Sequence, residues 1–324
     1  MSRARWVPLA LAWGVLVLCG LPALAITLSR ALASTDLRAV RLAAFAPFGV
    51  VLYALCLVAI LVLVLLAAGR GRIRLAVVAG VVALLLAVHV AWQAPFYAGS
   101  RATSAGEPLT VMTTNLLEGK GDIDAVVDAV RANKVDVLAV QEITAEALGK
   151  LTAALGDQLP YRAGQAAPGT MGTMLFADRP ITKARRIETS MGSWAADVGE
   201  WRVVVAHPAP PTLAVWPAEQ ELIIEEAAAE KPDLLLGDLN ASLDHHTTRR
   251  LLDDADLQDA ARASNAGWQP TWPAEGFAGV PLPPATAIDH VLIGDSLVAL
   301  ATETVEVPGS DHLALVAYLG SPEG

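Results

Sequence analysis

Residues 233–240 read Asp-Leu-Leu-Leu-Gly-Asp-Leu-Asn, an apolar stretch that ends in a glycine and two polar side chains. The leucines at 234–236 predict a short buried strand. The strand runs into Gly237, so that Asp238 and Asn240 lie at its edge, where a loop begins. Because loops at strand ends carry much of the binding and catalytic chemistry of α/β proteins, this segment predicts a sheet and a site at its rim.

Polar residues accompany the other predicted strands in the same way. The predicted strand at 109–114 runs into Asn115, and the strand at 135–140 runs into Gln141 and Glu142. The remaining strand-edge residues are His207 after the strand at 201–206, Asp289 and His290 near the start of the strand at 288–293, and Ser310, Asp311 and His312 directly before the strand at 313–319. We expect these edges to converge on one rim of a sheet.

Helical stretches alternate with the strands. The spacing of apolar residues predicts helices at 122–132, 145–155 and 214–229. The last of these is expected to turn its glutamates outward. A further strand is expected at 172–176, and residues 267–287, rich in Pro, Gly and Trp, are expected to form a long loop over one end of the sheets. This alternation predicts one α/β domain over residues 109–324, preceded by a linker at 99–108.

Three long apolar runs precede the linker, at residues 6–28, 42–68 and 73–92. Each reaches the ~20 residues that a helix needs to cross the hydrocarbon core of a bilayer. None has a polar face, which argues against the alternative that they are buried helices of a soluble core. His89, inside the third run, is expected to be an interfacial or helix-packing group. Residues 1–98 are therefore predicted to form a membrane anchor with three transmembrane helices.

The arginines around these runs predict the side of the membrane on which the domain lies. Those at the amino terminus and between the second and third runs are Arg3, Arg5, Arg70, Arg72 and Arg74, whereas the other loop holds Arg30, Arg38 and Arg41. Because positive residues concentrate in cytoplasmic loops, this excess predicts a multi-pass protein of the cell membrane with an extracytoplasmic domain. Alternatively, the first run is a signal peptide cleaved after the Ala-x-Ala-like end of residues 21–25, which leaves the domain on the same side.

The net charge differs sharply between the two parts of the chain. The first hundred residues hold eight arginines and one acid, Asp36, whereas the rest holds 15 basic and 32 acidic residues. A protein that binds nucleic acid needs basic side chains to neutralise phosphates. The composition therefore argues against nucleic acid as a partner. The expected partners are therefore the lipid bilayer and a phosphorylated substrate, with a lipid-linked one among the candidates.

The residue types at the strand edges suit metal-dependent hydrolysis of phosphoesters. Asn115, Glu142 and Asp311 offer hard oxygen ligands, which Mg²⁺ or Mn²⁺ prefers. A bound cation offsets the charge of a phosphate, and a histidine held by an aspartate can carry the proton of the attacking water or of the leaving oxygen. The sequence has no Cys/His cluster for a structural zinc, no Gly-rich phosphate loop and no G-x-S-x-G elbow.

At five motifs the domain resembles the endonuclease/exonuclease/phosphatase superfamily, which includes pancreatic deoxyribonuclease, the abasic-site endonucleases, inositol-phosphate 5-phosphatases and neutral sphingomyelinases. The motifs are Thr114-Asn115, Gln141-Glu142, Gly237-Asp238-Leu239-Asn240, Ile288-Asp289-His290 and Ser310-Asp311-His312, in the family's order. The resemblance covers roughly residues 109–319. It implies an α/β fold, a four-layer sandwich of two packed mixed β-sheets with outer helices. With the three apolar runs, the architecture looks closest to the VanJ-type glycopeptide-resistance membrane proteins.

The resemblance also implies a role for each matching position. The implied metal ligands are Asn115, Glu142 and Asp311, and the implied catalytic residues are His207, Asp238, Asn240, Asp289 and His312. Asp238 would orient and activate the attacking water, and Asn240 would bind a phosphate oxygen. Asp289 would orient His312 as an acid/base pair. His207, in a His-Pro segment that matches the family's second histidine, would contact the phosphate or the leaving group.

Some of these polar residues have a plainer explanation. Glu142 could be a charge at the start of the following helix. The run Asp244-His245-His246 suggests a metal site, but a helix start with solvated imidazoles is the favoured interpretation. His290 is expected to have a structural role on the other face of its strand. Trp268 and Trp272 either cap a pocket or fill the long loop.

Three functions fit the sequence. The leading one is hydrolysis of a phosphodiester, phosphomonoester or pyrophosphate at the outer face of the membrane, on a phosphorylated or pyrophosphorylated lipid, because a short linker would keep the domain near the head groups. An extracellular DNase-like nuclease would use the same motifs but conflicts with the acidic composition. A non-catalytic sensor that kept the fold would have no need of the complete set of residues.

Overall fold

Two units make up the chain, Met1–Ala94 and Pro95–Gly324, in a computed structural model. The structure describes all residues except 1–2, 100–101, 105–107, 277–278 and 323–324. The predicted linker at 99–108 therefore lies partly outside the described residues.

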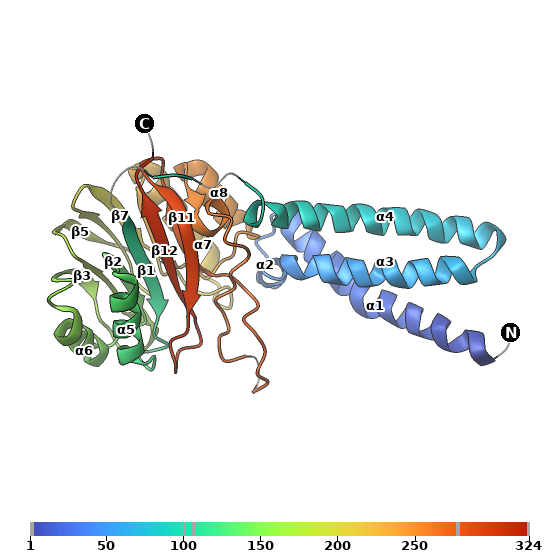
Figure 1. Cartoon of the computed structure of the whole chain (residues 1–324), viewed down its shortest axis with the longest axis horizontal. Coiled ribbons are helices and arrows are strands. Elements are labelled where there is room, and N and C mark those ends of the chain that lie inside the picture. Colours follow the sequence, from blue (N-terminus) through green and yellow to red (C-terminus); the bar gives the residue numbers. More distant parts are fainter. Residues whose placement is uncertain (1–2, 100–101, 105–107, 277–278, 323–324) are drawn as a thin grey trace. The chain divides into compact units, whose positions relative to one another are not determined.

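Long apolar helices form the first unit (Figure 1). Its elements are α1 (Arg3–Ala31), α2 (Leu37–Ala43), η1 (Ala46–Phe48), α3 (Gly49–Leu66) and α4 (Gly69–Gln93). The helical segments long and apolar enough to cross a membrane are Leu9–Ala31, Ala46–Leu66 and Gly69–Phe96. All three overlap the predicted apolar runs.

The turn between α3 and α4 is shorter than the sequence suggested. Only Ala67 and Ala68 form it, both with extended backbone, and α4 begins at Gly69. The arginines expected in the turn, Arg70, Arg72 and Arg74, lie instead in the first two turns of α4. Arginine is a good helix former, so the helix can start before these residues rather than after them.

His89 lies at the centre of a polar cluster inside the first unit. Its ring is fully buried, with Nδ1 2.9 Å from the carbonyl oxygen of Ala46 and Nε2 3.0 Å from Oγ1 of Thr27. The Thr27 hydroxyl also lies 2.7 Å from that of Tyr53. Gly49 packs so closely on the ring that a Cβ there would collide with it. Of the two roles expected for His89, packing between helices is the one observed.

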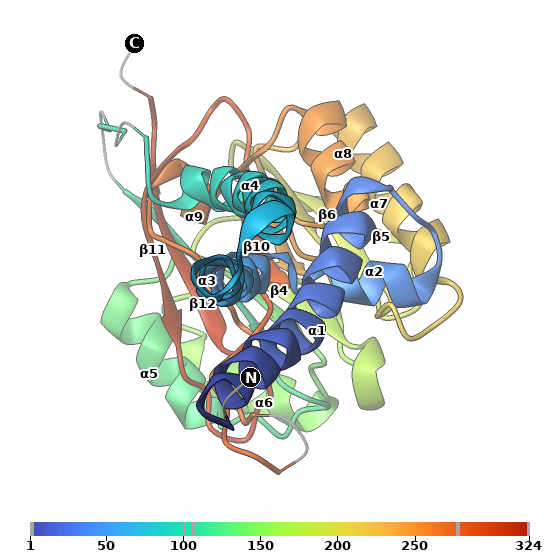
Figure 2. The same ribbon diagram turned by 90° about the vertical axis from the view of Figure 1, so that its right-hand side faces the viewer.

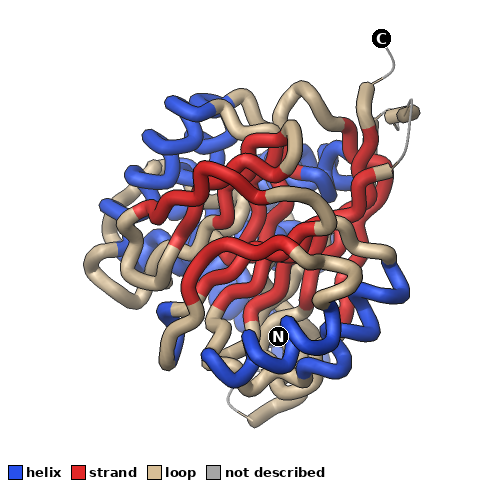
Figure 3. Tube along the Cα trace, turned by 90° about the vertical axis from the view of Figure 1, so that its left-hand side faces the viewer, coloured by secondary structure: helices blue, strands red, loops and turns tan. Residues whose placement is uncertain are grey.

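Two six-stranded sheets form the centre of the second unit (Figure 3). Across the first sheet the strands are β11 (Val298–Val305), β12 (Ala314–Gly320), β1 (Leu109–Asn115), β2 (Val137–Gln141), β4 (Thr173–Ala177) and β3 (Tyr161–Gln165). Across the second they are β5 (Ile181–Ile187), β6 (Ser193–Val198), β7 (Trp201–Val205), β8 (Leu234–Asp238), β10 (Asp289–Ile293) and β9 (Gln258–Asp259). Each sheet holds one parallel pair, so both sheets are mixed.

Helices cover the two sheets from opposite sides. α5 (Ile123–Asn133) and α6 (Ala145–Leu155) lie on one side, and α7 (Trp216–Glu230) and α8 (His246–Ala255) lie on the other (Figures 1 and 2). The short helix α9 (Ala260–Ala263) follows β9. The predicted four-layer sandwich is thereby confirmed.

Local sequence explains where the elements begin and why the layers pack. α5 and α6 start after Asp122 and Thr144, whose side chains accept hydrogen bonds from backbone N–H groups of the first turn. Side chains from both sheets form the apolar core between them, including Val111, Val205 and Leu236. Strands buried on both faces need such nearly continuous apolar sequences.

The strand directions bring polar residues to one edge of each sheet. β1 runs parallel to β2, and β7 runs parallel to β8, so the carboxyl ends of each pair meet at the same edge. β12 runs antiparallel to β1, and β10 runs antiparallel to β8, so these two strands start at that edge. The two sheets thus repeat one arrangement, a parallel pair with an antiparallel neighbour.

Candidate active site

Both sheets contribute to one buried polar group. The first sheet supplies Asn115, Glu142, Asp311 and His312, and the second supplies His207, Asp238, Asn240 and Asp289. Two hydrogen bonds join the contributions: Asn115 Nδ2 donates to Asp238 Oδ2 at 3.1 Å, and His312 Nδ1 lies 2.8 Å from Asp289 Oδ2. The structure therefore brings all of the predicted site residues to the place where the two sheets meet.

His312 and Asp289 form a buried pair within this group. The backbone N–H of His312 donates to Ser310 Oγ at 3.0 Å, and its Nε2 faces Asp238 Oδ2 at 3.7 Å. Burial by itself lowers the pKa of His312, but Asp289, Asp238 and Asp311 outweigh burial and raise it to about 10. The imidazole is therefore protonated at neutral pH.

Asp238 lies between the two sheets. Its Oδ1 accepts a hydrogen bond from the backbone N–H of Asn240 at 2.8 Å, and its Oδ2 accepts the one from Asn115. Burial raises the pKa of Asp238 to about 7, with His312 opposing the change and Asp289 adding to it. A carboxyl group with a pKa near 7 can accept a proton from water.

Glu142 and Asn115 hold each other at the end of the first sheet. Glu142 Oε1 accepts from Asn115 Nδ2 at 3.2 Å, and Oε2 accepts from the backbone N–H of Glu118 at 2.7 Å. Burial raises the pKa of Glu142 against these hydrogen bonds. Asn115 Oδ1 accepts from the N–H of Leu117 at 2.9 Å, which turns the amide nitrogen toward the carboxylates. The Asn115 oxygen that was predicted to bind a metal therefore already accepts a hydrogen bond. Glu142 belongs to this network and is not a charge at the start of a helix.

Asp311 is the most exposed acid of the group, with 32% of its side chain accessible. Trp272 Nε1 donates to its Oδ2 at 3.0 Å, and its Oδ1 lies 3.9 Å from Nε2 of His312. The backbone N–H of Ala274 donates to the Asp311 carbonyl at 2.7 Å. Trp272 therefore does more than fill the long loop, because it fixes the orientation of a predicted metal ligand.

Asn240 and Glu142 share a backbone conformation that few side chains adopt. Their φ angles are 48° and 56°, both in the left-handed region. Asn240 tolerates this conformation well, whereas Glu142 does so less readily, and such strain concentrates at functional sites. Asn240 Nδ2 donates to the Pro208 carbonyl at 3.0 Å, so the amide predicted to bind a phosphate oxygen is held close to the His207 segment.

His207 is the group's unpaired member. It is fully buried, and neither ring nitrogen makes a hydrogen bond of ordinary geometry among the described residues, although the backbone of Met191 lies near enough to raise its pKa. Its Nε2 lies 3.9 Å from Asp238 Oδ2, which is too long for a hydrogen bond. Burial lowers the pKa of His207 to about 3, helped by the charge of His312, so the ring is neutral. An unpaired buried imidazole is unfavourable in the free protein, and it leaves a donor for a phosphate oxygen.

The acids of the site fit a bound cation. Glu142, Asp238, Asp289 and Asp311 lie close together, and in the described part of the chain none of them pairs with a Lys or Arg. Ligand atoms of Asp238, Asp289 and His312 lie within 4.8 Å of one another. However, Asp289 occupies Nδ1 of His312, and a metal in this trio would break that hydrogen bond. The carboxylates of Glu142 and Asp311 keep free lone pairs and could hold a hard cation instead.

Other polar residues that drew attention in the sequence have structural roles. His290 is buried, with Nδ1 3.1 Å from Asp259 Oδ2 and Nε2 3.0 Å from a backbone carbonyl, as its predicted role requires. α8 does begin at this histidine pair, but the expectation of solvated imidazoles is wrong for His245. Ser242 N–H donates to its Nδ1 at 2.8 Å and draws the ring into the protein, whereas His246 is exposed.

One buried acid was not expected at all. Against the prediction that this helix turns its glutamates outward, Glu219 lies on the inner side of α7 and is only 5% exposed. It shares that side with the buried Trp216 and Ile223, at spacings of three and four residues. Helical periodicity could have revealed this position, since these three residues fall on one face.

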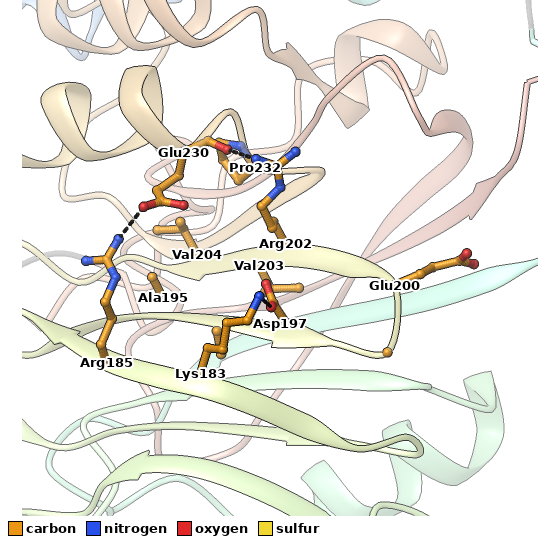
Figure 4. A pocket seen from close by; sticks show the side chains of 12 residues that line it. Lys183, Arg185, Ala195, Asp197, Glu200, Arg202, Val203, Val204, Glu230 and Pro232 are labelled. Carbon is orange, nitrogen blue, oxygen red and sulfur yellow. Dashed lines mark hydrogen bonds and ion pairs between the residues drawn. The ribbon is translucent and has the colours of Figure 1, made fainter.

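A hollow of about 590 Å³ lies over β5, β6 and β7 and is separate from this group (Figure 4). Its charged residues pair with one another, Lys183 with Asp197 at 2.8 Å and Arg185 with Glu230 at 3.0 Å. None of the predicted site residues lines it. The hollow therefore brings no further group to the chemistry described above.

Comparison with solved structures shows the same fold in several proteins. The endonuclease/exonuclease/phosphatase from Beutenbergia cavernae DSM 12333 has a TM-score of 0.53 and 20% identity, over 67% of this chain and 72% of that chain. The corresponding protein from Bacteroides vulgatus has a TM-score of 0.52 and 15% identity, over 67% and 100%. D. rerio TDP2 complexed with single-strand DNA product has a TM-score of 0.51 and 11% identity, over 67% and 100%.

Identities this low show the fold alone. Comparison with curated proteins gives no match. The sequence profile of the Endonuclease/Exonuclease/phosphatase family matches residues 112–312, which is more than half of the chain and includes every site residue described above. This chain therefore belongs to the endonuclease/exonuclease/phosphatase family.

Proposed function

We propose that this chain is a membrane-anchored, divalent-metal-dependent phosphoester hydrolase that acts at the outer face of the membrane. One observation carries the proposal: the His312–Asp289 pair, 2.8 Å apart, faces Asp238 beside carboxylates that no Lys or Arg of the described residues balances. The group combines a protonated imidazole with an acid, Asp238, whose pKa is raised by burial. These are the parts that proton transfer during phosphoester hydrolysis requires.

Mg²⁺ or Mn²⁺ is the cofactor that this donor set suits. Glu142 and Asp311 would hold the ion, and Asn115 would join them if its amide oxygen gave up the N–H of Leu117. The ion would neutralise charge on the phosphate. The charge of the ion would also oppose the burial that raises the pKa of Glu142.

The chain's own residues account for the proton transfers. Asp238 orients the attacking water and accepts its proton as the oxygen bonds to phosphorus. The bond from phosphorus to the leaving oxygen breaks, and that oxygen takes the proton from Nε2 of His312 while Asp289 holds the ring. His207 and Asn240 contact the non-bridging phosphate oxygens. Hydrogen-bond donors directed at the charge that develops in the transition state lower the barrier more than donors directed at the charge of the bound substrate.

The substrate class that we propose is a phosphorylated or pyrophosphorylated lipid. Three helical segments suited to crossing a membrane lie on the same chain as the site, as in the VanJ-type proteins that the architecture resembles. The acidic catalytic unit would repel a polyanion such as DNA. A lipid head group carries fewer charges and stays at the membrane surface.

The test is hydrolysis by the purified full chain in detergent micelles with Mg²⁺. The substrates are a lipid pyrophosphate, a lipid phosphodiester and double-stranded DNA, with His312→Ala protein and an EDTA-treated sample as controls. We expect phosphate or head-group release from a lipid substrate, lost in both controls. Cleavage of DNA alone would support the extracellular nuclease, and no hydrolysis by the wild type with any substrate would support a non-catalytic sensor.

A further inference from the structure

Glu219 places a carboxylate inside the catalytic unit without a charged partner among the described residues. It extends from α7, and each of its oxygens accepts one backbone hydrogen bond: Oε1 from Ser190 at 2.9 Å and Oε2 from Ala209 at 2.7 Å. Burying an acid is costly unless donors surround it. The two donors come from different segments, the connection between β5 and β6 and the segment that follows β7. One side chain therefore ties these two segments together.

The β5–β6 connection and the first residue of β6 hold the backbone of His207, which lies in the segment that follows β7. Its N–H donates to Ser193 Oγ at 2.8 Å, and its carbonyl accepts from Thr189 Oγ1 at 3.3 Å. The two hydroxyls lie 2.8 Å apart and so bond each other. Ser190, which donates to Glu219, lies directly between these contacts in sequence, and Ala209 lies two residues beyond the histidine. The carboxylate thus closes a ring of hydrogen bonds around His207.

The imidazole of His207 is held less directly. Neither ring nitrogen makes a hydrogen bond of ordinary geometry among the described residues, although the ring is fully buried, and the backbone of Met191, next to Ser190, lies near enough to raise its pKa. In His312, by contrast, a carboxylate 2.8 Å from Nδ1 fixes the ring directly. The direction of the His207 ring therefore depends on packing and on how firmly its backbone is held.

We propose that Glu219 is a positioning residue, which acts through the two loops to hold His207 where it can contact the substrate's phosphate. The proposal rests on the proposed function for its kinetic consequence, but the position of the ring can be tested without any substrate. A displacement of about 1 Å in a catalytic group can cost about 100-fold in rate. Glu219 is thus placed to affect turnover without touching the substrate.

The kinetic test compares Glu219→Gln in two backgrounds of the full chain. The amide keeps the volume but turns an NH₂ group toward one of the two backbone donors. We expect kcat to fall about tenfold or more with a small change in KM, because the substrate is still bound but His207 is misplaced. In a His207→Ala background the same substitution should change kcat less than twofold. Equal losses in both backgrounds would overturn the proposal.

The structural test uses the reaction of diethyl pyrocarbonate with imidazoles, read at His207 by mass spectrometry. The wild type should be protected, and Glu219→Gln should react at least several times faster at a temperature well below unfolding. Glu225→Gln, an exposed change on the same helix, is the control that should alter neither reactivity nor kcat. Glu219→Asp replaces the amide variant if that variant fails to fold, since it keeps the charge but cannot reach both loops.

The two tests separate failure of this inference from failure of the proposed function. Absence of hydrolysis in the wild type would remove the proposed function, and the reactivity of His207 would still decide whether Glu219 positions it. Unchanged reactivity in Glu219→Gln, or a lower melting temperature with unchanged kcat, would show that Glu219 only stabilises the fold.

Discussion

At the scale of single residues, two histidines of one site take opposite charge states. The pKa of His312 is raised to about 10 because three acids outweigh its burial, and the pKa of His207 is lowered to about 3 because burial and the charge of His312 outweigh the opposing effects of Asp289 and Met191. The decisive difference is an acid in hydrogen-bond contact: Asp289 lies 2.8 Å from His312, whereas Asp238 lies 3.9 Å from His207. One ring is thereby suited to donating a proton and the other to contacting an oxygen while neutral.

The His312–Asp289 pair can be tested by a double-mutant cycle. His312→Ala should lower kcat by roughly 10²–10⁴-fold, because it removes the proton donor. Asp289→Asn should lower kcat less, since it keeps a hydrogen bond while losing the charge and favouring the wrong tautomer. The double variant should be barely slower than His312→Ala, whereas adding His207→Ala should cost more. If the two substitutions lowered kcat independently, so that their effects multiplied in the double variant, Asp289 and His312 would not act as a pair.

Glu142 can be tested through its affinity for the metal. Glu142→Gln keeps the volume but removes the charge, so Mg²⁺ or Mn²⁺ should bind at least about tenfold more weakly and turnover should fall by orders of magnitude. Calorimetric titration with Mn²⁺ measures the affinity without a substrate. Glu146→Gln, an exposed change on α6, is the matched control. Unchanged Mn²⁺ affinity in Glu142→Gln would remove Glu142 from the metal assignment.

The sequence alone predicted that the site residues lie at one edge of the sheets, but it could not predict the orientation of their side chains. Motif order and strand ends put Asn115 and Glu142 together, because parallel strands share an edge. The direction of the Asn115 amide depends on the N–H of Leu117 in a turn that has no sequence signature. The ring of His245 is drawn inward by a similar local bond, from Ser242. The roles of the site residues stay predictions until their variants are measured.

At the scale of elements, the central strands were predicted and the outer ones were not. β1, β2, β4, β8, β10 and β12 are buried almost throughout, β7 is buried from Val203 onward, and the buried parts are mostly apolar. The missed strands, β3, β5, β6, β9 and β11, lie at or next to the edges of the sheets. β5 reads Ile-Thr-Lys-Ala-Arg-Arg-Ile, with its charged residues exposed. Charges on an edge strand prevent pairing with other chains, and they also remove the apolar pattern that reveals a strand.

The end of β8 offers a test of how closely the elements must approach. Gly237 has a φ of 141°, and a Cβ there would collide with the backbone of Ala206 on the neighbouring segment. Gly237→Ala should therefore destabilise the catalytic unit by at least about 2 kcal/mol and displace Asp238. Thermal unfolding followed by tryptophan fluorescence measures the change. Gly149→Ala, in the exposed part of α6 with open space around it, should instead stabilise by about 0.5–1 kcal/mol. Equal melting temperatures for the two variants would contradict the close approach.

At the scale of the whole molecule, the predicted extracytoplasmic position of the second unit can be tested with reporter fusions. Alkaline phosphatase fused after Gly99 should be active, and the same enzyme fused after Gly71 should be inactive, because it folds only outside the cytoplasm. The physical reason is the excess of arginines at the amino terminus and near the start of α4. Fusions of a fluorescent protein that matures only in the cytoplasm give the complementary control. The reverse pattern would place the site inside the cell.

The pairing of β12 with β1 has a consequence for when the predicted site can form. Ser310 Oγ donates to the Asn115 carbonyl across 195 positions of the chain, and His312 follows two residues later. A polypeptide still being synthesised, or still crossing a bilayer, holds Asn115 long before the partner segment arrives. The predicted site is therefore complete only after the segment that holds Ser310 and His312 has docked beside β1.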